Sequence, residues 1–299
     1  MILIILVYAI LASTFTLAKA SLQYSKPFFL IGCRMILAGT FLLGYLALFK
    51  RKALYITKND LLLFLKVALT HVYIFFIFEF WALSFPSLSS SKTSLIFTST
   101  PFVAAFLSYL LLGERLSLTK IMGMALGIIG LAPVLVLQVD PLEAGKEFFR
   151  FSFPEAILLI AVVSGAYAWF DIKKLMSKGY SLLLINGFAM LVGGIGAFLT
   201  SSLVEGFTPF PVSNIFQFSK YVLALILVSN IVFYNFYGWL LKRYSFTLLS
   251  FAGFLTPLFA AFYGWFFLGE TITWHYYFSL VVVFIALYIF YKDEILKKA

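Results

Sequence analysis

Three ionisable side chains, Arg34, His71 and Glu79, lie inside long apolar stretches of the sequence. A charged side chain at the centre of a bilayer costs about 2.5–3.5 kcal/mol on insertion scales, so such residues usually face a cavity or a partner. Counted from the outer ends of their helices, Arg34 lies roughly 9 Å deep and Glu79 roughly 5–6 Å deep, which permits a pair. The pair could clamp a zwitterionic substrate or close an outer gate. A structural ion pair, or two side chains reaching the lipid headgroups, explains the pattern equally well.

The histidine adds a second kind of chemistry. His71, Phe75 and Glu79 follow one another at four-residue spacing, which places them on one broad face of a helix. An imidazole in the middle of a membrane segment could change its charge near neutral pH and couple proton movement to substrate movement. The alternative is that the histidine simply forms a hydrogen bond to a neighbouring helix.

Hydroxyl, amide and aromatic side chains also interrupt the apolar segments. In lipid their polar atoms must bond to something, either a substrate in a cavity or an adjacent helix. The further candidates for binding substrate are Ser94, Thr98, Trp169, Asn230, Tyr234 and Tyr237. Aromatic residues make up 20% of the chain, and an aromatic face attracts a cation by about 0.5–2 kcal/mol. A sulfonium or a quaternary amine would suit such a cavity, and adenine would stack in it, although lipid-facing Phe and interfacial Tyr and Trp account for much of the same composition.

The elements that position these residues follow from the composition. Of the 299 residues, 63% are hydrophobic and 11% are charged, with a mean hydropathy of +1.04, whereas a soluble domain is about half apolar and a quarter charged. This excludes an ordinary soluble enzyme, a disordered chain and a nucleic-acid-binding domain. It predicts a multi-pass membrane protein whose partners are the lipid bilayer and a small-molecule substrate.

A bilayer core needs about 20 apolar residues per helix, and ten segments qualify: 2–20, 28–49, 61–82, 92–112, 121–139, 154–172, 182–204, 221–241, 245–268 and 274–291.

The distribution of charge predicts the orientation. The formal net charge is +10. With both termini in the cytoplasm, the inner loops hold 14 lysines and arginines and the outer loops hold 5, which matches the positive-inside rule. Lys66, near the end of a span, is expected to reach for the headgroups. One cysteine and two histidines predict no metal site and no cofactor.

A repeated motif relates the two halves of the chain. Residues 100–114 and 256–270 match at a constant offset of 156 positions, with eight of fifteen identical. The offset spans five helices, and an odd number of crossings inverts one half relative to the other, as in many secondary transporters. The predicted fold is therefore all-α, with ten transmembrane helices as two inverted five-helix repeats. The candidate hinge and motif residues are Pro101, Gly113, Glu114, Pro257, Gly269 and Glu270, with a static kink at each proline as the alternative.

This pattern resembles the EamA family of the drug/metabolite transporter superfamily over almost the whole chain. Lys19 near the end of the first span and Arg34 in the second also agree, whereas His71 and Glu79 depart from the family pattern. The resemblance implies ten helices with cytoplasmic termini in a bacterial inner membrane, and movement of a metabolite by alternating access. The predicted boundaries are 1–139 and 154–291 for the repeats, 140–153 for the connecting loop and 292–299 for a cytoplasmic tail.

One subgroup of this family resembles the chain more closely. Residues 251–265 are similar to the corresponding helix of S-adenosylmethionine/S-adenosylhomocysteine carriers of host-dependent bacteria. The resemblance implies uptake of S-adenosylmethionine in exchange for S-adenosylhomocysteine by a monomer or homodimer. The alternative is an EamA-type exporter or permease for an amino acid or another metabolite, with proton coupling as one option. The sequence contains no phosphate loop, Gly-x-Ser-x-Gly or His-Glu-x-x-His motif, so an enzyme is not expected.

Overall fold

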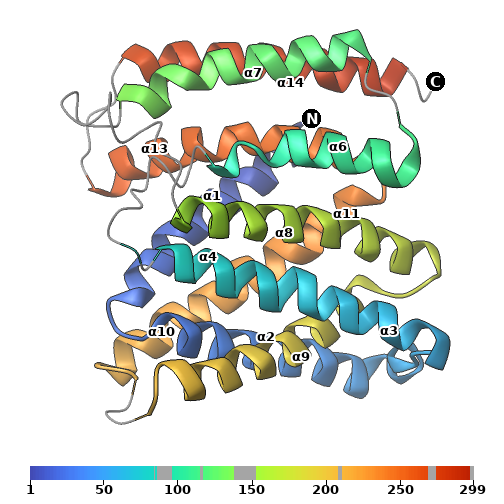
Figure 1. The fold of residues 1–299 in the computed structure, drawn as a ribbon, viewed down its shortest axis with the longest axis vertical. Helices are drawn as coiled ribbons and strands as arrows, with labels where there is room; N and C mark the ends of the chain where they lie inside the picture. The colour runs from blue at the N-terminus through green and yellow to red at the C-terminus, as the bar shows by residue number, and fades with distance from the viewer. Residues whose placement is uncertain are drawn as a thin grey trace. The chain divides into compact units, whose positions relative to one another are not determined.

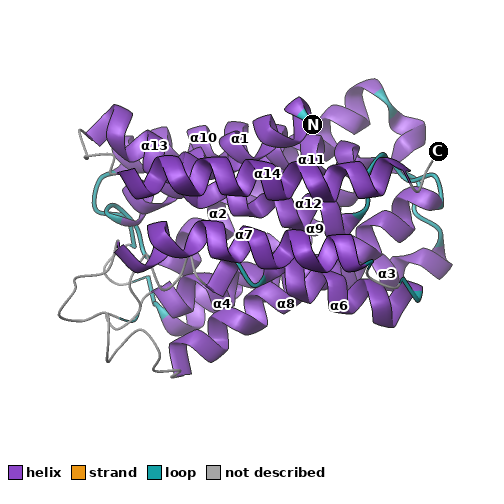
Figure 2. Cartoon of the chain, turned by 90° about the horizontal axis from the view of Figure 1, so that it is seen from above, coloured by secondary structure: helices purple, strands orange, loops and turns teal. Residues whose placement is uncertain are grey.

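The computed structural model describes residues 1–83, 85, 96–114, 117–137, 153–207, 211–268 and 274–296. Within these ranges the regular structure is helical, apart from one isolated bridge between Ser25 and Val212 (Figure 2). Among the described residues, seven helices are long and apolar enough to cross a membrane, and three shorter apolar helices accompany them. The prediction of an all-α membrane protein is therefore confirmed, whereas the start of the expected span 92–112 lies partly outside the described residues.

The helices of the first half of the chain keep close to the predicted spans. They are α1 (Ile2–Leu22), α2 (Pro27–Phe49), α3 (Lys58–Val67), α4 (Phe75–Leu83), α6 (Thr100–Leu112) and α7 (Leu118–Leu137). A π-helical segment, Ala68–Ile74, joins α3 to α4 without a break, so that one continuous helix runs from Lys58 to Leu83. A π-helical turn widens the backbone and is often found at functional sites.

The second half contains helices of corresponding length. They are α8 (Phe153–Ser177), α9 (Leu182–Val204), α10 (Ile215–Leu225), α11 (Tyr234–Leu241), α12 (Phe246–Phe251), α13 (Leu255–Leu268) and α14 (Trp274–Leu296). A second π-helical segment, Ile226–Phe233, joins α10 to α11. Adding the offset of 156 to the bounds of α2 gives 183–205, one residue from those of α9, and adding it to Ala68–Ile74 gives 224–230, which overlaps the second π-helical segment.

The chain forms two compact units, each of which draws helices from both halves of the sequence. The first unit contains residues 1–13, 82–162 and 244–299. In it α7 packs along α14 (Figure 1), and α6 packs on α12. Gly127 of α7 lets the ring of Phe254 approach the helix backbone, because a Cβ atom there would lie 2.6 Å from that ring. Gly130 does the same for Val282 of α14, also at 2.6 Å.

The second unit contains residues 14–81 and 163–243, and in it α2 and α9 pack side by side (Figure 1). These helices approach so closely that a Cβ atom on Gly39 would lie 2.5 Å from the backbone nitrogen of Leu191. Small residues at membrane helix interfaces allow such backbone contact. The end of α9 is tied to the start of α2 by Glu205, whose carboxylate accepts the N–H groups of Phe28 at 2.8 Å and Phe29 at 2.9 Å.

Candidate functional site

Arg34 is a buried cation in the second unit, on α2. Its Nε donates to Oδ1 of Asn230 at 2.8 Å, and its Nη2 donates to Oγ of Ser229 at 3.0 Å. The guanidinium also lies over the ring of Phe76, 5.2 Å from the ring centroid. A guanidinium carries five N–H donors, so this arrangement orients Arg34 and leaves donors available for a further acceptor.

The pair of Arg34 with Glu79 that the sequence permits is not a direct ion pair. Among the salt bridges of the described residues none joins the two, although their charges act on each other over a longer distance. Glu79 is buried on α4, with 7% of its surface exposed. Arg34 took amide and hydroxyl partners instead, because the π-helical segment Ile226–Phe233 presents Ser229 and Asn230 to α2.

Asn230 itself is held in place on its other side. It is completely buried, and its Nδ2 lies 3.1 Å from Sδ of Met35 and 3.6 Å from Sδ of Met190. Thioether sulfur is a weak acceptor, so the amide is oriented mainly by the bond that its oxygen accepts from Arg34. The sequence indicated Asn230 but not Ser229. A serine in an apolar helix often bonds to a carbonyl of its own helix, so its presence in the sequence does not show that it contacts another helix.

Four ring side chains form an aromatic cluster in the same unit, defined here as His71, Trp169, Tyr234 and Tyr237. The ring of His71 meets those of Trp169 and Tyr234 edge to face, with centroids 4.8 Å and 5.1 Å apart. Trp169 lies 4.4 Å from Tyr237 and stacks on Tyr234 at 6.2 Å. The structure therefore brings together four residues that the sequence proposed separately, from the continuous helix α3–α4, from α8 and from α11.

The imidazole of His71 carries an unsatisfied polar atom. The side chain is buried, and its Nε2 has no hydrogen-bond partner among the residues described. An unsatisfied buried polar atom costs about 1–3 kcal/mol. His71 shares with Phe75 the face that packs on α8, where a Cβ atom on Gly165 would lie 2.6 Å from the Phe75 ring. Phe75 thus supports the cluster by packing, one helical turn from His71.

A charged pair joins α3 to α8 in the same unit. Lys66 Nζ lies 3.1 Å from Oδ2 of Asp171 and also donates to the hydroxyl of Tyr167, over whose ring it lies at 4.4 Å. The structure gives Lys66 a carboxylate partner on α8 while its side chain stays 43% exposed, so the expectation that it extends to the headgroups stays a prediction. The available signal was that Lys66 and Asp171 lie at similar depth near the cytoplasmic ends of the predicted spans.

The remaining predicted residues lie elsewhere. Thr98 belongs to the first unit, and Ser94, Gly269 and Glu270 lie outside the described residues. Gly113 adopts φ +68° and ends α6, and its N–H bonds to the carbonyl of Tyr109 at 3.0 Å. The sequence Leu112-Gly113-Glu114, which ends the first repeated motif, therefore acts as a helix cap of the left-handed type. Glu114 is exposed.

The two repeated prolines follow interruptions of the α-helix. Pro101 lies in the first turn of α6, directly after a turn at residues 98–99, and Pro257 lies in the first turn of α13, after the 3₁₀ segment Ala252–Phe254. Proline is tolerated in a first turn because its missing N–H would have no partner there. Both prolines thus follow a local break in an apolar segment, and whether they act as hinges or as static kinks stays a prediction.

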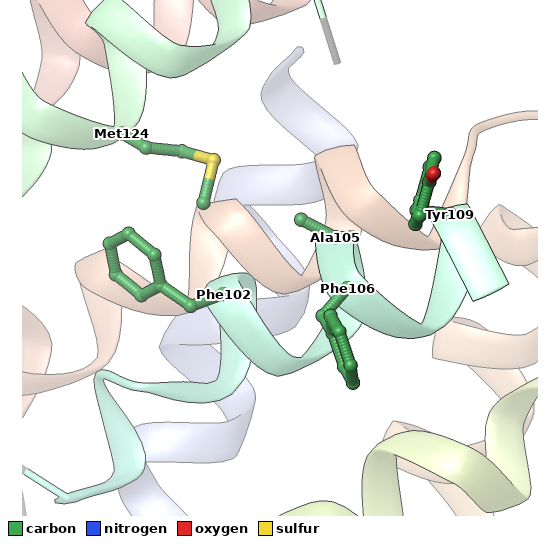
Figure 3. Close-up of a pocket in the computed structure, with 5 residues that line it drawn as sticks. All are labelled: Phe102, Ala105, Phe106, Tyr109 and Met124. Carbon is green, nitrogen blue, oxygen red and sulfur yellow. The ribbon is translucent and has the colours of Figure 1, made fainter. Parts of the chain in front are cut away.

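A groove of about 300 Å³ lies in the first unit between α6 and α7 (Figure 3). It is lined by Phe102, Ala105, Phe106, Tyr109 and Met124, which point from the two helices as Figure 3 shows. None of these side chains is charged, and Phe106 is 61% exposed. The groove has the character of a lipid-facing surface and is chemically unlike the buried cation and aromatic cluster of the second unit.

Comparison with known proteins places the whole chain among transporters. The EamA-like transporter family matches residues 1–136 and 153–292. A protein of Chlamydia muridarum named S-adenosylmethionine/S-adenosylhomocysteine transporter is 34% identical over 87% of this chain and 81% of its own length. A probable amino-acid metabolite efflux pump of Escherichia coli is 27% identical over 96% of this chain and 93% of its own. One solved crystal structure superposes with a TM-score of 0.76 over 98% of this chain and 97% of its own, at 18% identity, which is a likeness of fold alone.

Proposed function

The chain belongs to the EamA-like transporter family, and from this premise we propose that it is a secondary carrier that takes up S-adenosylmethionine in exchange for S-adenosylhomocysteine. Family membership and the named relatives make it a membrane transporter rather than an enzyme. The observation that carries the choice of substrate is the 34% identity to chlamydial transporters of these two compounds over 87% of the chain.

The site in the second unit supports this choice chemically. Both compounds carry an amino-acid carboxylate and ammonium at one end and adenosine at the other, and S-adenosylmethionine adds a sulfonium cation. The unused donors of Arg34 suit the carboxylate, and the carboxylate of Glu79 suits the ammonium. The aromatic cluster offers a stacking surface for adenine and a π face for the sulfonium, worth about 0.5–2 kcal/mol per contact.

The unsatisfied Nε2 of His71 fits the same ligand. Adenine presents hydrogen-bond donors and acceptors on its edge, and one such bond would remove the cost of leaving that nitrogen unpaired. We assign His71 to recognition of the base in preference to proton coupling, since its neighbours Trp169 and Tyr234 are aromatic rings. Ser94 and Thr98 stay candidates for binding substrate on the sequence alone.

The proposed transport cycle is alternating access by two inverted five-helix repeats, working as a monomer or homodimer. The recurrence of helix bounds and of a π-helical segment at the offset of 156 residues supports the repeat. The excess of basic residues in alternate loops supports cytoplasmic termini in the inner membrane. The breaks that precede Pro101 and Pro257 are the proposed hinges, and the two Leu-Gly-Glu sequences are the proposed helix ends beyond them.

The proposal is tested by counterflow in liposomes that contain the purified protein. Vesicles loaded with unlabelled S-adenosylhomocysteine should accumulate labelled S-adenosylmethionine saturably, and empty vesicles should not. Absence of saturable uptake, together with clear counterflow of amino acids, would replace this substrate by the alternative that the E. coli relative favours, namely export of an amino acid or similar metabolite.

A further inference from the structure

The π-helical segment Ile226–Phe233 carries both residues that hold Arg34. Its Asn230 and Ser229 accept hydrogen bonds from the guanidinium at 2.8 Å and 3.0 Å. The segment is wider than an α-helix, because the N–H of Tyr234 bonds to the carbonyl of Ser229, five residues back. Where this five-residue spacing returns to the four-residue spacing of an α-helix, one backbone carbonyl is left without an N–H partner. A carbonyl of this kind inside a membrane protein needs another donor.

The side chain of Asn235 supplies a donor at this point of the helix. Its Nδ2 lies 2.8 Å from the carbonyl oxygen of Ile231 and 3.4 Å from that of Asn230, the two carbonyls at which the spacing changes. Its Oδ1 accepts a hydrogen bond at 3.2 Å from Nδ2 of Asn186, a completely buried residue of α9. Asn235 thus ties the π-helical turn to a neighbouring helix, although the site described above makes no use of it.

The helix that follows the π-helical turn is fixed by its neighbour. A Cβ atom on Gly238 of α11 would lie 2.5 Å from Cδ2 of Leu182, so α11 and the start of α9 are in close contact. The bond between the two asparagines lies one helical turn away on the same pair of helices. If the π-helical turn relaxed to an α-helical turn, the residues before it would rotate relative to α11 by one residue step, about 100°. The two residues that hold the guanidinium would then turn away from it.

The other π-helical segment, Ala68–Ile74, is stabilised in the same manner. It carries His71, and the carbonyl of the preceding residue, Thr70, accepts a hydrogen bond at 2.8 Å from Oγ of Ser164 on α8. Each π-helical segment therefore carries one part of the candidate site and has a carbonyl bonded to a side chain. Ser164 serves the part with His71, and Asn235 serves the part with Arg34.

We propose that Asn235, held by Asn186, is a positioning residue for the substrate carboxylate. It keeps Ile226–Phe233 in the π-helical form, so that Ser229 and Asn230 occupy Nε and Nη2 of the guanidinium and leave Nη1 for the substrate. The inference rests on the proposed function for the identity of the ligand. Because Asn235 acts through the guanidinium and does not touch the substrate, its loss should affect only ligands that carry a carboxylate.

Equilibrium binding to the purified protein tests this role. Asn235→Leu keeps the size of the side chain and removes the donor, so it should weaken binding of S-adenosylmethionine about tenfold, part of the effect of losing a bond to a charged group. Binding of 5′-methylthioadenosine, which has no carboxylate, should stay at the wild-type value. The double variant Asn235→Leu with Arg34→Gln should bind S-adenosylmethionine no more weakly than Arg34→Gln alone, since both changes act on one contact.

A conservative variant should rescue the loss. The hydroxyl of a threonine can bond to the carbonyl four residues back, as Thr200 does to Gly196 at 3.0 Å. Asn235→Thr therefore keeps a donor for Ile231 and should bind S-adenosylmethionine within about threefold of wild type, which is less than the effect of one neutral hydrogen bond. A merely structural asparagine would not separate the two ligands in this way.

Ser164→Ala is the matched control, because it removes the corresponding donor from the other π-helical segment. It should weaken both ligands equally, since both contain the adenosine that His71 is proposed to bind. Asn186→Ala is a milder change than Asn235→Leu, and it should weaken S-adenosylmethionine about threefold and leave 5′-methylthioadenosine unchanged. It decides the question if Asn235→Leu does not fold.

Three results would refute the positioning role. They are equal losses for the two ligands in the asparagine variants, wild-type binding of S-adenosylmethionine in these variants, and a loss confined to carboxylate ligands in Ser164→Ala as well. If wild type binds neither adenosyl compound and exchanges amino acids instead, the proposed substrate is wrong. The positioning role is then judged with an amino acid and its carboxamide, which lacks the carboxylate, in the same variants.

Discussion

Replacement of Arg34 tests whether this residue binds substrate or only supports the fold. Arg34→Gln removes a buried positive charge. The guanidinium donates from Nε to Asn230 at 2.8 Å and from Nη2 to Ser229 at 3.0 Å, and its other N–H groups are proposed to bind the substrate carboxylate. One hydrogen bond to a charged group contributes about 1.5–3 kcal/mol. Since each 1.36 kcal/mol is a factor of ten, the affinity for S-adenosylmethionine should fall about 10- to 150-fold.

The assay is equilibrium binding to the purified protein, measured separately from flux. Arg34→Lys keeps the charge without the planar fork, so its affinity should lie between those of wild type and Arg34→Gln. Asn230→Ala is the matched control, because it removes the residue that orients Arg34 and keeps the guanidinium. It should lower the unfolding temperature and weaken binding less than Arg34→Gln does.

The ligand series shows which end of the substrate Arg34 serves. The Arg34→Gln effect should be large for S-adenosylmethionine and S-adenosylhomocysteine, and absent for 5′-methylthioadenosine, which has no carboxylate. Equal losses for all three ligands, or wild-type affinity in the variant, would refute the assignment and leave Arg34 as a structural residue that orders α2 against the segment Ile226–Phe233.

Three further predictions concern the same unit. His71→Phe keeps the ring contacts and removes the unpaired Nε2, so the unfolding temperature should stay the same or rise. The affinity for adenosine should fall about 2- to 10-fold, which corresponds to one neutral hydrogen bond. A large drop in unfolding temperature would contradict this prediction. Gly39→Ala forces a Cβ atom to within 2.5 Å of a backbone nitrogen, so it should lower the free energy of unfolding by about 1–3 kcal/mol. Gly44 has open space around it, so Gly44→Ala should lower that free energy far less in the same unfolding assay. Glu205→Ala removes the acceptor of two N–H groups at the start of a helix and should lower stability by about 0.5–2 kcal/mol; an unchanged unfolding temperature would show that the contact is dispensable.

Several members of the candidate site could be selected from the sequence, but which of them pair could not. Arg34, His71, Trp169 and Asn230 stood out because polar groups in apolar segments need partners. Depth along a helix suggested that Arg34 could meet Glu79, whereas the structure joins it to Asn230, 196 positions away. Depth alone does not give the rotation of a helix about its axis, and rotation decides which side chains meet.

Composition and hydropathy determined the class of protein, a helical membrane protein, because the cost of placing polar groups in lipid acts on every residue independently of its distant neighbours. The repeated motif predicted the relation between the two halves. Tertiary structure alone decided the rest. The π-helical segments shift the register at His71 and Asn230, and glycine faces bring α2 within backbone contact of α9. Lys66 meets Asp171 only because α3 and α8 pack at one particular rotation, and that rotation depends on contacts between segments about a hundred residues apart.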